Sequence, residues 1–169
     1  MGTSHPESRP WTLQKIMEVE PEYILDIGAG SGTYSEALRG VGYKGYIDAV
    51  EVWGPYIEEY ALKGLYRNVF EEDVRKWTNF DYDVVIFGDI LEHMTKQEAL
   101  DVWARTAMQA DYAVIAIPII HYHQGAINDN PYEEHVKDDW THDEVINTFP
   151  GIVDFWQGSI VGAYWADFR

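Results

Sequence analysis

The stretch YILDIGAGSGTY, residues 23–34, is an apolar run that breaks into glycines at alternate positions. The pattern predicts a buried strand over 23–28 and a helix over 32–39, which glycines at 40 and 42 end. Glycine permits a close approach to the backbone because it has no Cβ atom. We therefore expect a ligand to meet the turn between this strand and this helix. A tight turn that binds nothing is the alternative interpretation.

Strand and helix patterns alternate along the chain on both sides of this turn. Apolar runs predict strands at 23–28, 46–52, 67–71, 82–87 and 112–117, and a final hairpin with arms at 152–157 and 160–166. Helices are predicted at 11–19, 32–39, 56–63, 96–110 and 141–149. The alternation predicts an α/β fold with a doubly wound, mainly parallel sheet, helices on both faces and an antiparallel strand from the hairpin. Ligands of such folds bind at the carboxyl ends of the strands.

The length and composition predict one folded domain over residues 1–169. The chain is 46% apolar, and no stretch reads as a linker between domains. Residues 1–20 form an N-terminal segment whose first ten residues are polar and are expected to be loose. Residues 119–140 form a long loop without periodicity. Loops of this length in compact domains are usually functional or disordered, and we expect this one to contact the substrate.

The composition also disfavours several classes of protein. The absence of cysteine excludes disulfides, zinc–thiolate sites and a cysteine nucleophile. The apolar runs are too short to span a bilayer and the N-terminus lacks a secretory pattern, so a cytoplasmic protein without a membrane partner is expected. The 29 acidic and 12 basic side chains give a net charge of −17. That charge repels phosphate backbones and argues against a nucleic-acid partner.

Three kinds of ligand could meet the glycine turn: the phosphates of a nucleoside triphosphate, the pyrophosphate of a dinucleotide, or the methionine end of S-adenosylmethionine. The phosphate-binding P-loop is excluded because no Gly-Lys-Ser/Thr follows. The dinucleotide fingerprint requires glycine or alanine where this chain has Thr33, and its third glycine stands at Gly32 instead. Three successive strands end in or precede the acids Glu51, Asp73 and Asp89. A cationic sulfonium cofactor with a ribose diol and an adenine amine suits these acids.

The motifs, in this order, resemble class I S-adenosylmethionine-dependent methyltransferases. The matching stretches cover about 23–118 and are YILDIGAGSG, YIDAVEV, FEEDVRKW, FDYDVVIFGDILEHM and ADYAVIAIPI. A weaker match, HVKDDWTHDEV, and the final hairpin follow them. The resemblance implies a seven-stranded sheet whose last strand is antiparallel. It also implies S-adenosylmethionine as the cofactor and S-adenosylhomocysteine as the product.

The resemblance further implies which residues hold the methionyl part of the cofactor. The backbone of Gly28, Ala29 and Gly30 would meet this part. Asp26 would help to hold its amino group, and the main chain around Asp89 would contact the same amine. These roles are carried over by position in the motif.

On the adenosine side, the resemblance assigns residues at the next two strand ends. Glu51 would bind both ribose hydroxyls. Val52 and Trp53 would lie against the adenine. Asp73 would accept a hydrogen bond from the adenine amine, and the Val74 amide would donate one to the ring.

Methyl transfer to a hydroxyl or amine requires an aligned acceptor, exclusion of water and a base, for which histidine suits near neutral pH. The candidate catalytic residues are His93, just past the fourth strand, and His121 and His135 in the 119–140 loop. Extended spacing places His121 on the same face as His123. The loop pattern is similar to small methyltransferases that occur alongside sugar-modifying enzymes. We therefore expect a small-molecule or glycan-like acceptor, methylated on oxygen in preference to nitrogen.

A metal is the less favoured interpretation of the residues that follow the fourth strand. Asp89, Glu92 and His93 resemble the metal site of ubiquinone-pathway O-methyltransferases, in which a divalent ion would ionise a hydroxyl. This chain has Asp where that pattern has Glu, and Asp89 already has a cofactor role. A nicotinamide-dependent oxidoreductase, which Thr33 disfavours, and a non-catalytic cofactor-binding module stay open as alternative functions. The sequence also leaves the oligomeric state open.

Overall fold

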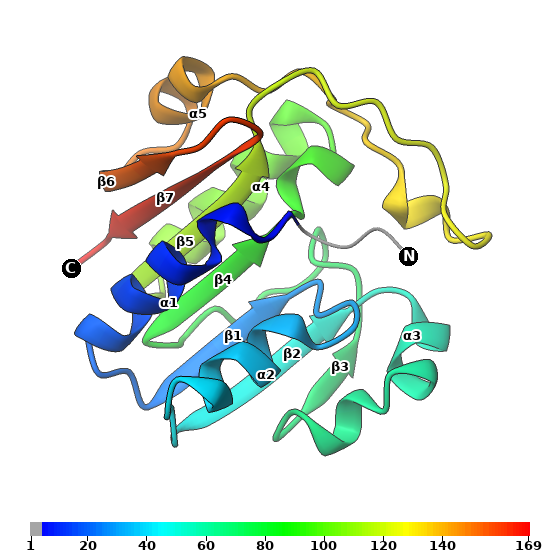
Figure 1. Cartoon of the computed structure of the whole chain (residues 1–169), viewed down its shortest axis with the longest axis vertical. Helices are drawn as coiled ribbons and strands as arrows, with labels where there is room; N and C mark the ends of the chain where they lie inside the picture. Colours follow the sequence, from blue (N-terminus) through cyan, green and yellow to red (C-terminus); the bar gives the residue numbers. More distant parts are fainter. Residues whose placement is uncertain (1–4) are drawn as a thin grey trace.

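The computed structural model describes residues 5–169, which form a seven-stranded sheet in the order β3-β2-β1-β4-β5-β7-β6 (Figure 1). The strands are β1 Tyr23–Ile27, β2 Tyr46–Glu51, β3 Val69–Glu71, β4 Val84–Gly88, β5 Tyr112–Pro118, β6 Ile152–Gln157 and β7 Val161–Asp167. Strands β1 to β5 pair in parallel, and β7 is antiparallel to both β5 and β6. The predicted sheet, including its antiparallel strand near the C-terminus, is confirmed.

Helices cover both faces of this sheet. They are α1 Arg9–Glu18, α2 Thr33–Gly40, α3 Gly54–Glu59, α4 Lys96–Ala107 and α5 His142–Thr148, with single 3₁₀ turns at η1 Pro6–Ser8, η2 Leu62–Gly64, η3 Leu91–His93 and η4 Pro131–Glu133. In Figure 1, α1 and α2 lie on the near face of the sheet and α4 lies behind it. Across residues 5–169, none of the helices combines the length and the apolar character that crossing a membrane requires.

The two-residue period of the strands divides the core into two layers. Leu25 and Ile27 pack on the face that holds Trp103 of α4, whereas Ile24 packs on the opposite face with Ile16 of α1. Helix α4 begins with a capping box, in which Thr95 and Glu98 each accept a hydrogen bond from the other's backbone N–H. Both faces of the central strands are therefore buried, and their free ends are left to form a site.

The start of the chain departs from the expected loose segment. Residues 6–18 form η1 and α1, and Glu7 accepts hydrogen bonds from the backbone N–H groups of Ile160 and Val161, each at 2.8 Å. A third bond comes from the Ser159 hydroxyl at 3.2 Å. The carboxylate satisfies backbone donors at the start of β7, and this anchors the segment. Positions 1–4 of the predicted loose segment lie outside the described residues.

Candidate functional site

A cavity of about 340 Å³ lies at the carboxyl ends of the parallel strands. Its walls come from the turn after β1, the end of β2, the segment after β4, the 119–140 loop and the N-terminal residues His5 and Pro6. A second cavity of about 70 Å³ reaches the residues that follow β3. The two cavities share Gly28, Val52, Ile90, His93 and Tyr132 in their linings. Residues of the 119–140 loop thus line the same cavity as the carboxyl ends of the parallel strands, where a ligand was predicted to bind.

The glycines of the turn after β1 serve different purposes. Gly28 has a φ of +70°, which strains any other residue, and a Cβ atom built on it would lie 1.9 Å from Cδ1 of Ile90, so that side chain would have to move. Gly30 also has a positive φ, +54°, but the nearest atom to a Cβ at this position is 3.9 Å away. The space beside Gly30 therefore belongs to the cavity. This is the position at which a ligand can approach the backbone.

Glu51 ties the end of β2 to this turn. Its carboxylate accepts hydrogen bonds from the backbone N–H of Gly30 at 2.9 Å and of Trp53 at 3.0 Å. The side chain is only 5% exposed, and burial raises the pKa of its carboxyl while the two N–H donors oppose that rise. A carboxylate has about four acceptor positions, so two of them stay available to a ligand in the cavity.

The structure places Asp26 beneath the turn, away from the cavity lining. This carboxyl is 1% exposed and accepts a hydrogen bond from the Tyr66 hydroxyl at 2.6 Å. Burial raises its pKa to about 7, and the nearby Glu51 adds to the rise. Asp89, by contrast, does line the cavity. Its φ of +54° is a left-handed conformation that is costly outside glycine and is found preferentially at functional sites.

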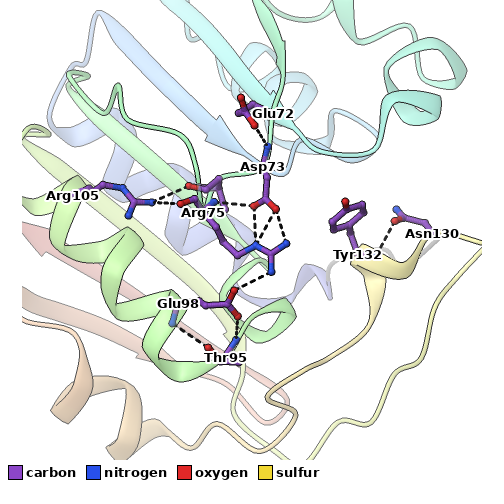
Figure 2. Close-up of polar contacts among 9 residues, drawn as sticks. Glu72, Asp73, Arg75, Thr95, Glu98, Arg105, Asn130 and Tyr132 are labelled. Carbon is purple, nitrogen blue, oxygen red and sulfur yellow. Dashed lines mark hydrogen bonds and ion pairs between the residues drawn. The ribbon is translucent and has the colours of Figure 1, made fainter.

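Asp73 and Val74 line the smaller cavity, together with Arg75. The Arg75 guanidinium donates to both oxygens of Asp73, from Nε at 3.0 Å and from Nη2 to Oδ2 at 2.6 Å. Its Nη1 atom also donates to Glu98 at 3.0 Å, so the arginine links the end of β3 to the start of α4, as Figure 2 shows. The predicted adenine acceptor therefore already has a cationic partner.

Two of the three candidate histidines meet in the cavity. His93 and His135 line it, and their ring centroids are 5.0 Å apart. The Nδ1 atom of His93 lies 3.0 Å from the Glu134 carbonyl oxygen, and that of His135 lies 2.6 Å from the Tyr122 carbonyl oxygen. Burial lowers the pKa of both imidazoles, which favours their neutral form.

The third candidate, His121, is not brought to the cavity. Its side chain is 72% exposed and its Nε2 atom lies 3.2 Å from Asp138, which His123 also approaches at 3.5 Å. The predicted shared face of these two histidines is therefore observed, but it faces away from the site. Tyr122, which stands between them, lines the cavity instead, because successive side chains of an extended segment point to opposite sides.

Glu92 lies in the same cavity wall and is buried, with 2% of its surface exposed. Neither of its side-chain oxygens has a hydrogen-bond partner among the described residues. Burial raises the pKa of this carboxyl well above its usual value, and the charge of Asp89 adds to the effect. An unpaired buried carboxyl is costly, so this group calls for a function.

Several lining residues were missed by the sequence reasoning. They are His5, Tyr34, Tyr56, Gln124 and Asn130. Asn130 carried the clearest signal, because Asn before Pro131 is a good cap for a helical turn, and its side chain accepts from the Tyr132 backbone N–H at 2.9 Å. Figure 2 shows this pair on the loop side of the site, across from Asp73. No lysine or arginine of residues 5–169 lines the larger cavity, whereas Glu51, Asp89, Glu92 and Glu133 do.

No protein-family model matches this chain, and no curated protein is similar enough in sequence to count as a relative. Solved structures are similar in fold. An S-adenosylmethionine-dependent methyltransferase from Clostridium acetobutylicum ATCC 824 has a TM-score of 0.71 at 11% identity, covering 98% of this chain and 92% of that one. The N-terminal domain of EvdMO1 with S-adenosylhomocysteine bound has a TM-score of 0.69 at 14% identity, covering 99% of this chain and 82% of that one.

A third similar structure is a candidate O-methyltransferase from Nostoc punctiforme PCC 73102, with a TM-score of 0.67 at 16% identity. The match covers 94% of this chain, which spans only 56% of the Nostoc protein. These likenesses establish that the chain has the Rossmann-like fold of class I S-adenosylmethionine-dependent methyltransferases. The fold predicted from the sequence motifs is confirmed, and the activity has to be argued from the site.

Proposed function

Since the chain has the methyltransferase fold, we propose that it transfers a methyl group from S-adenosylmethionine to a hydroxyl oxygen of a small-molecule or glycan-like acceptor. One observation carries the proposal. The open backbone at Gly30, the Glu51 carboxylate and the imidazoles of His93 and His135 line a single cavity at the carboxyl ends of the strands. The first two fit the cofactor, and the imidazoles fit the acceptor.

The cofactor would lie across both cavities. Its methionyl part would meet the backbone of Gly28, Ala29 and Gly30 in the larger cavity, beside Asp89. The positive sulfonium suits a wall that has carboxylates and no cation. The ribose would use the two acceptor positions that Glu51 retains.

The adenine would occupy the smaller cavity. Val52 and Val74 offer apolar contacts to the ring, and Asp73 would accept from its amine while remaining paired to Arg75. Asp26 would stay beneath the turn, bonded to the Tyr66 hydroxyl, and would not touch the cofactor, because it is not part of either lining.

The acceptor would bind on the side of the 119–140 loop. In the transfer, the sulfur–methyl bond breaks as the oxygen–methyl bond forms, and the hydroxyl proton goes to a base. The Nε2 atom of His93 or His135 can take this proton, because Nδ1 of each faces a carbonyl oxygen and must carry its own hydrogen. The lack of cationic lining disfavours phosphorylated or carboxylated acceptors, and Tyr122 and Tyr132 offer aromatic surface to an uncharged one.

Calorimetric titration tests the cofactor. Saturable binding of S-adenosylhomocysteine and no binding of NAD⁺ is the expected result. The reverse preference would replace the proposal with the oxidoreductase, and absence of both would refute it. Transfer of a radiolabelled methyl group to panels of neutral hydroxyl compounds and glycans then tests turnover. A chain that binds the cofactor and labels no acceptor in any fraction would be the non-catalytic module.

A further inference from the structure

Two segments from opposite ends of the chain contribute to the wall of the larger cavity. His5 and Pro6 come from the N-terminal segment, and Ile160 and Val161 come from the turn that leads into β7. His5 and Pro6 are exposed to solvent, whereas Ser8, directly after them in the chain, is only 2% exposed. Residues 5–7 therefore form a short flap at the mouth of the cavity, which we call the N-terminal flap.

One side chain, that of Glu7, joins the N-terminal flap to the sheet. Its Oε1 atom accepts hydrogen bonds from the backbone N–H groups of Ile160 and Val161, each at 2.8 Å, and its Oε2 atom accepts one from the Ser159 hydroxyl at 3.2 Å. A Cβ atom built on Gly158 would lie 2.4 Å from the same Oε1 atom, so the glycine leaves room for the carboxylate. The turn before β7 is therefore a close-fitting site for this one carboxylate.

Few other contacts hold the N-terminal flap. Among residues 5–169, the hydrogen bonds that connect the flap with the sheet all end on the Glu7 carboxylate. Its other bonds are local, from the Glu7 backbone N–H to Nδ1 of His5 at 3.4 Å and from the Arg9 backbone N–H to the Pro6 carbonyl oxygen. Segments with few buried apolar contacts open at a low cost in free energy, and the lids of binding sites are commonly of this kind. A flap held in this way can open while α1 and the sheet stay folded.

We propose that the N-terminal flap is a gate of the larger cavity and that Glu7 is the latch that keeps it closed. Glu7 is not part of the lining, so it is a positioning residue that acts on the cavity through His5 and Pro6. When the latch opens, the flap moves away and the imidazoles of His93 and His135 become accessible from solution. Passage of a cofactor or an acceptor through this gate rests on the proposed function, whereas the latch and the access to the cavity do not.

The geometry of the latch ranks the effects of three substitutions. Glu7→Ala removes all three accepted hydrogen bonds and should open the gate most. Glu7→Gln keeps an oxygen for the two backbone N–H groups but loses the charge, and bonds to a charged acceptor are about twice as strong, so its effect should be smaller. Glu18→Ala is the matched control, because the partners of this carboxylate, Gln14 and Lys15, lie in the same helix α1.

The test measures access to the cavity directly, on the full chain and without any ligand. Diethyl pyrocarbonate acylates neutral imidazoles, and mass spectrometry gives the rate of reaction at each histidine. The rates at His93 and His135 should rise about tenfold or more in Glu7→Ala, because opening no longer breaks hydrogen bonds to a charged group. They should rise less in Glu7→Gln and stay at the wild-type value in Glu18→Ala.

Two other histidines serve as internal references. His121 is 72% exposed and reports the activity of the reagent. His142 is half-buried outside the cavity lining, with Nδ1 2.9 Å from the Tyr164 hydroxyl, and reports loosening of the remaining fold. Both should react at the same rate in all four proteins.

Unchanged rates at His93 and His135 in Glu7→Ala would overturn the proposal, and so would an equal rise at His142, which would mean that the whole fold has loosened. Hydrogen exchange is the second readout, since the backbone amides of Ile160 and Val161 should exchange faster in Glu7→Ala. Titration of S-adenosylhomocysteine separates this proposal from the proposed function. Its failure to bind would refute the proposed function, while the histidine rates decide the gate independently.

Discussion

At the scale of single residues, the Glu51 carboxylate can stabilise the glycine turn and bind a ligand at the same time. It holds the backbone N–H groups of Gly30 and Trp53, and its remaining acceptor positions are open to the cavity. The first task shapes the turn and the second fits a ribose diol. Because both tasks use the same side chain, cofactor binding and the shape of the glycine turn are coupled.

Replacement of Glu51 by alanine should weaken S-adenosylhomocysteine binding by about 2–4 kcal/mol, through loss of two charge-assisted hydrogen bonds to the ribose and a looser turn. Calorimetry measures the change. Glu71→Ala is the matched control, because Glu71 ends the neighbouring strand β3 and lines neither cavity. Equal affinities of Glu51→Ala and the wild type would show that the ribose lies elsewhere.

The buried carboxyl of Asp26 should make the stability of the protein depend on pH. Burial raises its pKa from 3.8 to about 7, so the folded state binds a proton that the unfolded state has released between these values. Stability should therefore fall as pH rises from about 4 to about 7. Asp26→Asn keeps an oxygen for Tyr66 and removes the titration, so its stability relative to the wild type should increase by about 3 kcal/mol between pH 5 and pH 8.

Urea unfolding of both proteins at the two pH values measures this difference. All other titrations are shared by the two proteins and cancel in the comparison. Parallel pH profiles would mean that Asp26 is ionised in the folded state throughout, with the Tyr66 hydrogen bond outweighing burial.

Residue types at strand ends were predictable, and their partners were not. The alternation of strands and helices placed Glu51 and Asp89 at the binding edge, and both line the cavity. The same reasoning could not foresee that Asp26 accepts from Tyr66, forty positions away, or that Arg75 pairs with Asp73. The first contact depends on side-chain packing in three dimensions, which no local pattern specifies. The second joins residues only two positions apart, but the sequence reasoning gave Asp73 a role towards the cofactor alone.

At the scale of elements, the strands followed from their apolar runs, and the irregular parts did not. The helix predicted over 56–63 is in fact split into α3, Gly54–Glu59, and η2, Leu62–Gly64, because Ala61 adopts a φ of +49° between them. The turns η3 and η4 are too short to leave a periodic signal. Both nevertheless bring residues to the cavity, including His93 and Tyr132.

The loop's short turn η4 should control cofactor binding more than overall stability. Asn130 is buried and caps it through the Tyr132 backbone N–H. Loss of such a cap costs about 0.5–2 kcal/mol, so Asn130→Ala should weaken S-adenosylhomocysteine binding by about 2- to 30-fold while the melting temperature changes little. The control is Thr141→Ala, which removes the cap of α5 and should lower the melting temperature without affecting the affinity.

If η4 is part of the binding site, calorimetry should show a weaker affinity only for Asn130→Ala, and melting curves should show a lower melting temperature only for Thr141→Ala. A lower melting temperature with unchanged affinity in Asn130→Ala would instead mean that the loop only stabilises the fold. Tyr132 would then lie beside the cofactor without contributing to its binding.

At the scale of the whole molecule, charge decides which partners can approach. The net charge of −17 is spread over 169 residues, and four of the acidic side chains line the larger cavity, where there is no lysine or arginine from residues 5–169. The electrostatic potential of the whole protein and that of the cavity are therefore both negative. Both attract a cationic cofactor or metal ion and repel phosphate groups.

Nucleic acid should accordingly fail to bind. Phosphate backbones bind proteins chiefly through lysine and arginine, with release of counterions, and the affinity then falls steeply as salt rises. We expect no change in the fluorescence anisotropy of a labelled RNA or DNA oligonucleotide at about 0.15 M salt, where the screening length is about 8 Å, and none at lower salt, where repulsion extends further. Submicromolar binding that weakens with added salt would reveal a basic surface strong enough to overcome the net charge. Nucleic acid would then have to be considered as the methyl acceptor in place of a small molecule or glycan.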